Sequence, residues 1–153
     1  MHLSEVIIIG GGIIGMLTAR ELHNAGVDVL VIERGPLGGE SSWAGGGIIS
    51  PLYPWRYSKP VNQLAEISKT IYPGLAQQLQ DESGVDCELI TSGLLFTSLD
   101  EQQQAENWAR EWSVELQTIT DTRQIHQIEP KVSPAINSGL WLPDIMQIRN
   151  PKL

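Results

Sequence analysis

Residues 6–33 read VIIIGGGIIGMLTARELHNAGVDVLVIE, and their pattern gives the clearest fold prediction in the chain. The β-branched run Val6–Ile9 is typical of a buried parallel strand. After a glycine-rich turn, the apolar spacing predicts a helix from about Ile14 to Asn24. A second apolar run, Val27–Ile32, predicts another strand. The stretch therefore predicts a parallel strand–helix–strand unit.

The glycines of the turn have the GxGxxG spacing of a dinucleotide-binding fingerprint. Gly10 allows the tight turn, Gly12 lets a pyrophosphate approach the backbone, and Gly15 lets the helix pack close to the strand. The helix points its N-terminal amides and positive dipole end at the phosphates. Glu33 ends the second strand, where its carboxylate can accept hydrogen bonds from both hydroxyls of an adenosine ribose. An ordinary glycine-rich turn in an α/β protein is the alternative.

A second concentration of glycine and serine follows in residues 34–54, RGPLGGESSWAGGGIISPLYP. The hydroxyls of Ser41 and Ser42 and the amides of Gly45–Gly47 suit a second approach to a long dinucleotide. A nicotinamide dehydrogenase would normally continue into a plain loop and a crossover helix. A flexible loop is the alternative interpretation of this stretch.

The composition bounds the class of protein. The chain has 153 residues, 41% hydrophobic and 18% charged, as in a soluble globular protein that can bury a core. Its formal net charge of −8 argues against nucleic acid or an anionic membrane as a partner. Cys87 is the only cysteine, which excludes an intrachain disulfide and favours a reducing compartment. The first apolar run is too short to span a membrane, so we expect a cytoplasmic protein.

The pattern after residue 56 is mixed. Helical spacing covers residues 60–82, where we expect Leu64, Ile67, Ile71, Leu75 and Leu79 to belong to the core and Pro73-Gly74 to kink or split the helix. A hairpin is expected from strands 87–91 and 94–98, joined at Ser92-Gly93. Further predicted elements are a helix over 100–112 with a Ser98–Glu101 capping box, a strand over 114–119, a short helix over 120–128 and a strand over 139–142.

The chain resembles a known family through GGGIIG, the acid that ends the second strand, and ESSWAGGGIISPLYPWR at residues 40–56. These motifs are similar to those of the FAD-dependent amino-acid oxidases of the D-amino-acid oxidase superfamily, and within it to the glycine oxidases of thiamine biosynthesis. The similarity continues through LAEISKTIYPGLAQQLQDESGVD (64–86), SGLLF (92–96) and IEPKVSPAINSGLWLPD (128–144). It therefore covers almost the whole chain.

The resemblance implies FAD as cofactor and binding roles for four groups of residues. The pyrophosphate would lie on the backbone of the first glycine turn, the ribose on Glu33, and the adenine near Arg34. Ser41 and Ser42 would approach the phosphates, and a later glycine segment would lead toward the flavin ring. The complete predicted set is Gly10, Gly11, Gly12, Ile13, Ile14, Gly15, Glu33, Arg34, Ser41, Ser42, Gly46, Gly47 and Ile48. No residue is assigned a catalytic or metal-binding role.

The implied reaction is the oxidation of glycine or a small D- or N-methyl amino acid by molecular oxygen, which gives an α-keto acid, ammonia and hydrogen peroxide. A D-amino-acid dehydrogenase that passes electrons to a quinone is a rival, as is an NAD-dependent dehydrogenase. A truncated chain that binds nothing is the third alternative. A homo-oligomer is compatible with all of them.

The resemblance also predicts the domain organisation. We assign residues 1–56 to the N-terminal part of a Rossmann-like FAD-binding domain and residues 57–153 to mixed helices and strands of a substrate-side domain. The predicted class is thus α/β, with an α+β mixture after residue 56. A doubly wound sheet needs further parallel strands. In the family, a later half supplies them together with the flavin-ring contacts and a substrate-binding arginine, so we expect this chain to be an N-terminal portion.

Overall fold

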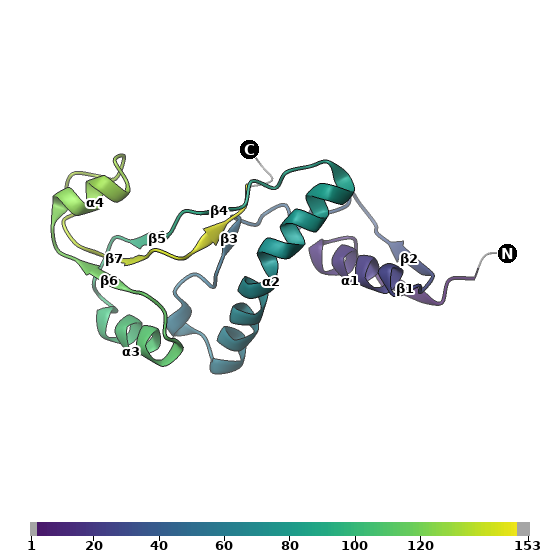
Figure 1. Cartoon of the computed structure of the whole chain (residues 1–153), viewed down its shortest axis with the longest axis horizontal. Helices are drawn as coiled ribbons and strands as arrows, with labels where there is room; N and C mark the ends of the chain where they lie inside the picture. Colours follow the sequence, from purple (N-terminus) through teal and green to yellow (C-terminus); the bar gives the residue numbers. More distant parts are fainter. Residues whose placement is uncertain (1–2, 150–153) are drawn as a thin grey trace. The chain divides into compact units, whose positions relative to one another are not determined.

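The computed structural model describes residues 3–149. They form two compact units, residues 3–46 and residues 47–149 (Figure 1). The boundary follows Gly46, which is earlier than the boundary proposed from the sequence after residue 56. The chain pairs within the second unit as soon as it reaches Ile48–Ile49. The predicted α/β start followed by mixed α and β structure is confirmed.

The first unit is a parallel strand–helix–strand. Strand β1 (Val6–Ile9) pairs with β2 (Val29–Ile32) in parallel, with Ile9 opposite Ile32, and helix α1 (Ile13–Asn24) connects them. The helix ends at Asn24, and Gly26, two residues later, has a φ of 83° in the left-handed region. Because both strands end at the same edge, the residues that follow them meet there.

The second unit contains two three-stranded antiparallel sheets. One has the strand order β3-β8-β4 and the other β5-β7-β6. Its elements in chain order are β3 (Ile48–Ile49), the 3₁₀ helix η1 (Pro54–Arg56), α2 (Lys59–Ser83), β4 (Ile90–Thr91), β5 (Leu94–Phe96), α3 (Gln102–Trp112), β6 (Gln117–Ile119), α4 (Thr122–Ile128), β7 (Gly139–Leu142) and β8 (Met146–Gln147).

The predicted hairpin at Ser92-Gly93 is wrong. Strand β4 pairs with β8, and β5 pairs with β7, so the two strands belong to different sheets. Gly93 has a φ of 69°, and the N–H groups of Ser92 and Gly93 both donate to the carbonyl of Ile145. The turn is therefore closed by a later segment of the chain, which separates the two strands.

Helix α2 differs from the prediction in two respects. It runs unbroken through Pro73, so the predicted split is wrong, while the alternative prediction of a kink stays a prediction. The stripe expected in the core is largely exposed: Leu64, Ile67 and Ile71 are 65%, 60% and 58% exposed. The helix buries Asn62 and Ala76 instead. The periodicity correctly predicted an apolar face on this helix, but it does not indicate whether other residues cover that face.

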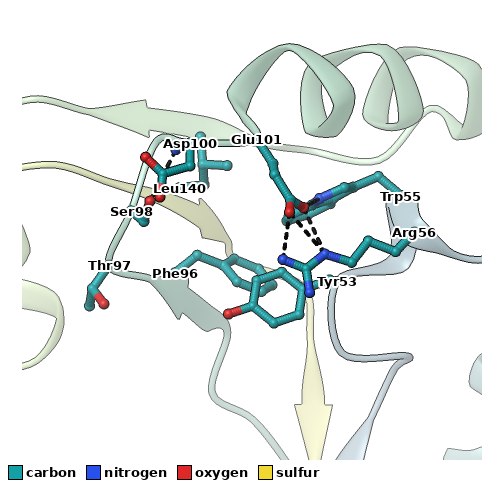
Figure 2. A pocket seen from close by; sticks show the side chains of 9 residues that line it. All are labelled: Tyr53, Trp55, Arg56, Phe96, Thr97, Ser98, Asp100, Glu101 and Leu140. Atoms are coloured by element: carbon teal, nitrogen blue, oxygen red, sulfur yellow. Dashed lines mark hydrogen bonds and ion pairs between the residues drawn. The ribbon is translucent and has the colours of Figure 1, made fainter.

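Helix α3 forms as predicted but starts at Gln102, and no capping box closes it. The hydroxyl of Ser98 accepts the N–H of Asp100 at 3.0 Å. The carboxylate of Glu101 accepts instead from Trp55 and Arg56 (Figure 2). These two donors lie far earlier in the chain, which is why the local spacing did not predict the contact.

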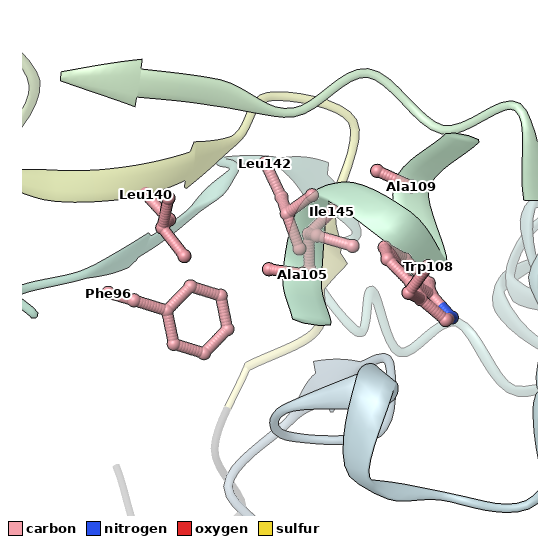
Figure 3. Close-up of a cluster of buried hydrophobic side chains, with 7 residues drawn as sticks. All are labelled: Phe96, Ala105, Trp108, Ala109, Leu140, Leu142 and Ile145. Atoms are coloured by element: carbon pink, nitrogen blue, oxygen red, sulfur yellow. The ribbon is translucent and has the colours of Figure 1, made fainter. Parts of the chain in front are cut away.

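The core of the second unit lies between α3 and the β5-β7-β6 sheet. Its buried side chains are Phe96, Ala105, Trp108, Ala109, Leu140, Leu142 and Ile145 (Figure 3). Strand β7, at the centre of the sheet, contributes two of them. Each large apolar side chain buried there stabilises the unit by about 1.5–3 kcal/mol. Trp108 and Trp112 both pack here, as their shared helix face predicted.

Candidate functional site

The glycine turn of the first unit is joined to the acid that ends β2. The N–H of Gly10 donates to the carbonyl of Ile32 at 2.8 Å, and Gly10 has a φ of 108°, which favours glycine. The N–H of Gly11 donates to Oε2 of Glu33 at 2.7 Å, and the N–H of Gly35 donates to Oε1 at 2.9 Å. One oxygen of Glu33 therefore holds the glycine turn, and the other holds the start of the loop after β2.

These hydrogen bonds also fix the charge at the site. The N–H of Gly11, and then that of Gly35, lower the pKa of the Glu33 carboxyl below its ordinary value. The carboxylate is therefore ionised at neutral pH. Each of its oxygens has a second lone pair, so ribose hydroxyls can still donate to it. The sequence predicted the ribose role but missed the bond to Gly11, since nothing local signals it.

The N-terminus of α1 presents amides in the way an anion site requires. Gly12 precedes the helix, and the N–H of Ile13 donates to the hydroxyl of Ser42 at 2.8 Å. In residues 3–149, the N–H groups of Gly12 and Ile14 donate to no other group of the chain. The first turn of a helix leaves such amides without an intrahelical partner, and its dipole favours negative charge.

Two glycines of the turn allow close approach. A Cβ at Gly15 would overlap the carbonyl oxygen of Gly10 and lie 3.1 Å from its carbon, so only glycine lets α1 lie this close to β1. A Cβ at Gly12 would meet only the hydroxyl of Ser42, at 3.2 Å. The space above Gly12 is therefore bordered by a hydroxyl and helix amides, which are the groups that bind phosphate oxygens.

The loop after β2 folds back over the turn, which the sequence did not predict. The N–H of Gly38 donates to the carbonyl of Gly11 at 2.8 Å, and the side chain of Leu37 occupies the space where a Cβ at Gly11 would point. Gly38 has a φ of 69°. Gly38 is the first Gly of the PLGG stretch, residues 36–39, and this Pro- and Gly-rich composition is a sequence signal for such a turn.

The structure brings together part of the predicted set. Gly10–Gly15, Glu33 and Ser42 are in contact within the first unit. Arg34 makes an ion pair with Glu40 of the same loop, and Ser41 is exposed.

The last three residues of the predicted set have other surroundings. Gly46 ends the first unit, and a Cβ there would meet nothing within 4 Å. Gly47 and Ile48 belong to the second unit. The carbonyl of Gly47 accepts the N–H of Ile148 at 2.8 Å, and Ile48 pairs with Gln147. Their predicted approach to a flavin ring stays a prediction.

The residues of the first unit fit the adenosine and pyrophosphate part of a dinucleotide. The fit rests on amides at the start of α1 that have no acceptor within residues 3–149, a hydroxyl beside them, and an ionised carboxylate at the end of β2. Within residues 3–149, no helix is both long and apolar enough to cross a membrane. In the same residues, no group of three or more His, Cys, Asp or Glu side chains is placed to hold a metal ion.

Known proteins share both the sequence and the fold. The chain is 44% identical to glycine oxidase from Pseudomonas aeruginosa over 97% of its length and 41% of that protein's. It is 26% identical to the bifunctional protein ThiO/ThiG from Trichormus variabilis, over 97% of this chain and 23% of that protein. The crystal structure of glycine oxidase from Geobacillus kaustophilus superimposes with a TM-score of 0.87 at 26% identity, over 99% of this chain and 42% of that one.

The chain thus spans about two fifths of the length of the glycine oxidases it matches. The family described as FAD dependent oxidoreductase, DAO, matches residues 5–153. This match covers the strand–helix–strand unit, its glycine turn and the whole second unit. The chain belongs to the DAO family of FAD-dependent oxidoreductases.

Proposed function

We propose that this chain forms the nucleotide-binding start of an FAD-dependent amino-acid oxidase. The observation that carries the proposal is the joint placement of the Glu33 carboxylate and the α1 amides around one glycine turn. Family membership identifies the dinucleotide as FAD. An NAD-dependent dehydrogenase would need the same turn but belongs to a different family.

Each residue of the site has a physical role in the proposal. The amides of Gly12 and Ile14 would donate to the pyrophosphate, and the hydroxyl of Ser42 would move aside or donate as well. Glu33 would accept both ribose hydroxyls while it continues to hold Gly11. Its negative charge also disfavours a 2′-phosphate, which selects an unphosphorylated adenosine.

Arg34, Ser41, Gly46, Gly47 and Ile48 retain the roles that the family resemblance gives them. Arg34 would lie near the adenine after its ion pair with Glu40 opens, an exchange that costs little because both side chains are largely exposed. Ser41 is exposed and can turn toward a phosphate. Gly46, Gly47 and Ile48 would lead toward the flavin ring.

The proposed substrate is glycine or a small D- or N-methyl amino acid, and molecular oxygen is the electron acceptor. FAD supplies the hydride acceptor for the substrate carbon, while the protein orients the reactants. The products are an α-keto acid, ammonia and hydrogen peroxide. The names of the relatives support this reaction, and the ThiO/ThiG name supports a place in thiamine biosynthesis. We propose a cytoplasmic location.

The test uses the flavin-loaded protein that carries these 153 residues. Peroxide is measured after glycine is added in air, with an enzyme-free control. Peroxide formed in proportion to the glycine consumed supports the oxidase. Reduction of a quinone analogue without peroxide would identify a D-amino-acid dehydrogenase instead. A purified protein without flavin absorbance would contradict the proposal as a whole.

A further inference from the structure

A single carboxylate joins two elements of the second unit that are far apart in sequence. Glu101, which precedes α3, accepts the indole N–H of Trp55 at 2.5 Å. It also accepts Nε of Arg56 at 2.8 Å and Nη2 at 2.5 Å (Figure 2). The Arg56–Glu101 pair is bidentate, a geometry that fixes orientation as well as charge. We call Trp55, Arg56 and Glu101 the carboxylate clamp.

Aromatic contacts hold the same side chains from the other side. The guanidinium of Arg56 lies 3.9 Å from the centre of the Tyr53 ring, within cation–π distance. The rings of Tyr53 and Trp55 each lie 4.9 Å from that of Phe96. Phe96 belongs to the buried core. The clamp thus connects η1 to the core as well as to α3.

The backbone beside the clamp is in a conformation that side chains rarely adopt. Tyr53 has φ and ψ of 57° and 66°, in the left-handed region, which is unfavourable for a bulky residue. Such a conformation persists only where the surroundings fix it. Asn62, which is buried, contributes by donating its side-chain amide to the carbonyl of Pro54 at 3.0 Å.

Four residues, Ser50 to Tyr53, lie between this fixed point and β3. Strand β3 is itself held, since Ile48 and Ile49 pair with β8. A loop this short, held at both ends, has few paths available. A cavity of about 150 Å³ borders the clamp, so these side chains would have room to move if the clamp were absent. The clamp therefore determines the path of the loop together with the ring contacts on Phe96.

We propose that Glu101 is a positioning residue for the reaction. Through Trp55 and Arg56 it fixes the loop Ser50–Tyr53, which follows Gly47 and the β3 strand Ile48–Ile49. This inference rests on the proposed function, which assigns Gly47 and Ile48 to the flavin side. Because the loop is already ordered before the substrate binds, binding does not have to offset the entropy cost of ordering it.

The first test reads the clamp itself and needs no cofactor. Amide hydrogen exchange is compared between the wild-type chain and Glu101→Gln. The amides measured are those of Arg56 and Tyr57, which donate to the carbonyls of Tyr53 and Pro54. We expect exchange at these two amides to be about tenfold faster, a change of ~1.4 kcal/mol in opening, and the Trp55 indole resonance to shift. Amides of β5 and β7 keep their rates, because the clamp is partly exposed and contributes little to overall stability.

Glu111→Gln is the matched control. Glu111 lies near the end of α3 and pairs with an exposed lysine, Lys59, at 2.9 Å. It should leave the exchange of Arg56 and Tyr57 unchanged. Trp55→Phe is a milder second variant that removes one donor and keeps the ring, and it should accelerate the same amides less. Unchanged exchange at Arg56 and Tyr57 in Glu101→Gln, or equal acceleration throughout β5 and β7, would overturn the inference.

The second test links the clamp to the reaction in the flavin-loaded protein. We expect Glu101→Gln to raise KM for glycine about tenfold, which corresponds to ~1.4 kcal/mol. Its kcat and its flavin content should stay within twofold of wild type. Glu111→Gln should match wild type in all three. Wild-type kinetics in Glu101→Gln, together with faster exchange, would mean that the clamp is structural only and the positioning role is wrong. Absence of flavin from the wild-type protein would refute the proposed function, while the exchange test would still decide the clamp.

Discussion

The close contact at Gly15 gives a quantitative prediction. In Gly15→Ala the new Cβ overlaps the carbonyl oxygen of Gly10, a backbone atom that cannot turn away, and lies 3.4 Å from Cγ2 of Ile8. Helix α1 must therefore shift away from β1. Such overpacking costs typically about 1–3 kcal/mol, and a backbone overlap belongs near the upper end. The better helix propensity of alanine offsets about 1 kcal/mol, so we expect a net loss of about 2 kcal/mol.

The assay is amide hydrogen exchange in residues 6–24, compared with Gly74→Ala. Gly74 also lies inside a helix, but a Cβ there meets nothing within 4 Å. Gly74→Ala should therefore stabilise α2 by about 0.5–1 kcal/mol. A loss of 2 kcal/mol corresponds to roughly thirtyfold faster exchange in α1 and β1 of Gly15→Ala. Exchange as slow as in wild type would refute the assignment of Gly15 to close helix–strand packing.

Three further predictions concern the cofactor. Glu33→Ala should weaken FAD binding by roughly 1–3 kcal/mol, measured as flavin retained after dialysis, with unchanged retention counting against the ribose role. Hydrogen bonds lower the pKa of Glu33 in the folded state. Its contribution to the stability of the fold is therefore present above the ordinary pKa of a Glu carboxyl and is lost as the pH falls through the lowered value. FAD affinity should fall in wild type as the pH drops through the lowered pKa of Glu33, and not in Glu33→Gln, which a fluorescence titration can check. Gly12→Ala should retain the fold, since the hydroxyl of Ser42 can rotate, yet lose at least about tenfold in FAD affinity.

The first unit could be predicted because its signals are local. Each signal depends only on neighbouring residues: the apolar run Val6–Ile9, the glycine spacing and the apolar run before Glu33. Their order allows one simple connection, a parallel strand–helix–strand unit. The contact between Glu33 and Gly11 joins residues 22 positions apart. It follows only once the parallel pairing of β1 and β2 brings both strand ends to one edge.

The second unit was harder because its contacts are distant in sequence. Strands β3, β4 and β8 have two residues each, which is too short for a periodic signal. The partners of β4 and β5 come from residues 139–147, so a turn at Ser92-Gly93 indicated a hairpin that does not form. Glu101 had the right spacing for a capping box, but a bidentate arginine is a stronger partner than a backbone amide.

Titration of the isotope-labelled 153-residue chain with FAD, followed by amide chemical shifts, tests whether the first unit binds the nucleotide. The chain spans about two fifths of its relatives' length, so we expect weak binding, and chemical shifts report even millimolar affinity. We expect shifts at Gly11, Gly12 and Ile14 and beside Glu33, and smaller shifts in Gly12→Ala. Shifts confined to residues outside the first unit, or no shift at millimolar FAD, would contradict this expectation.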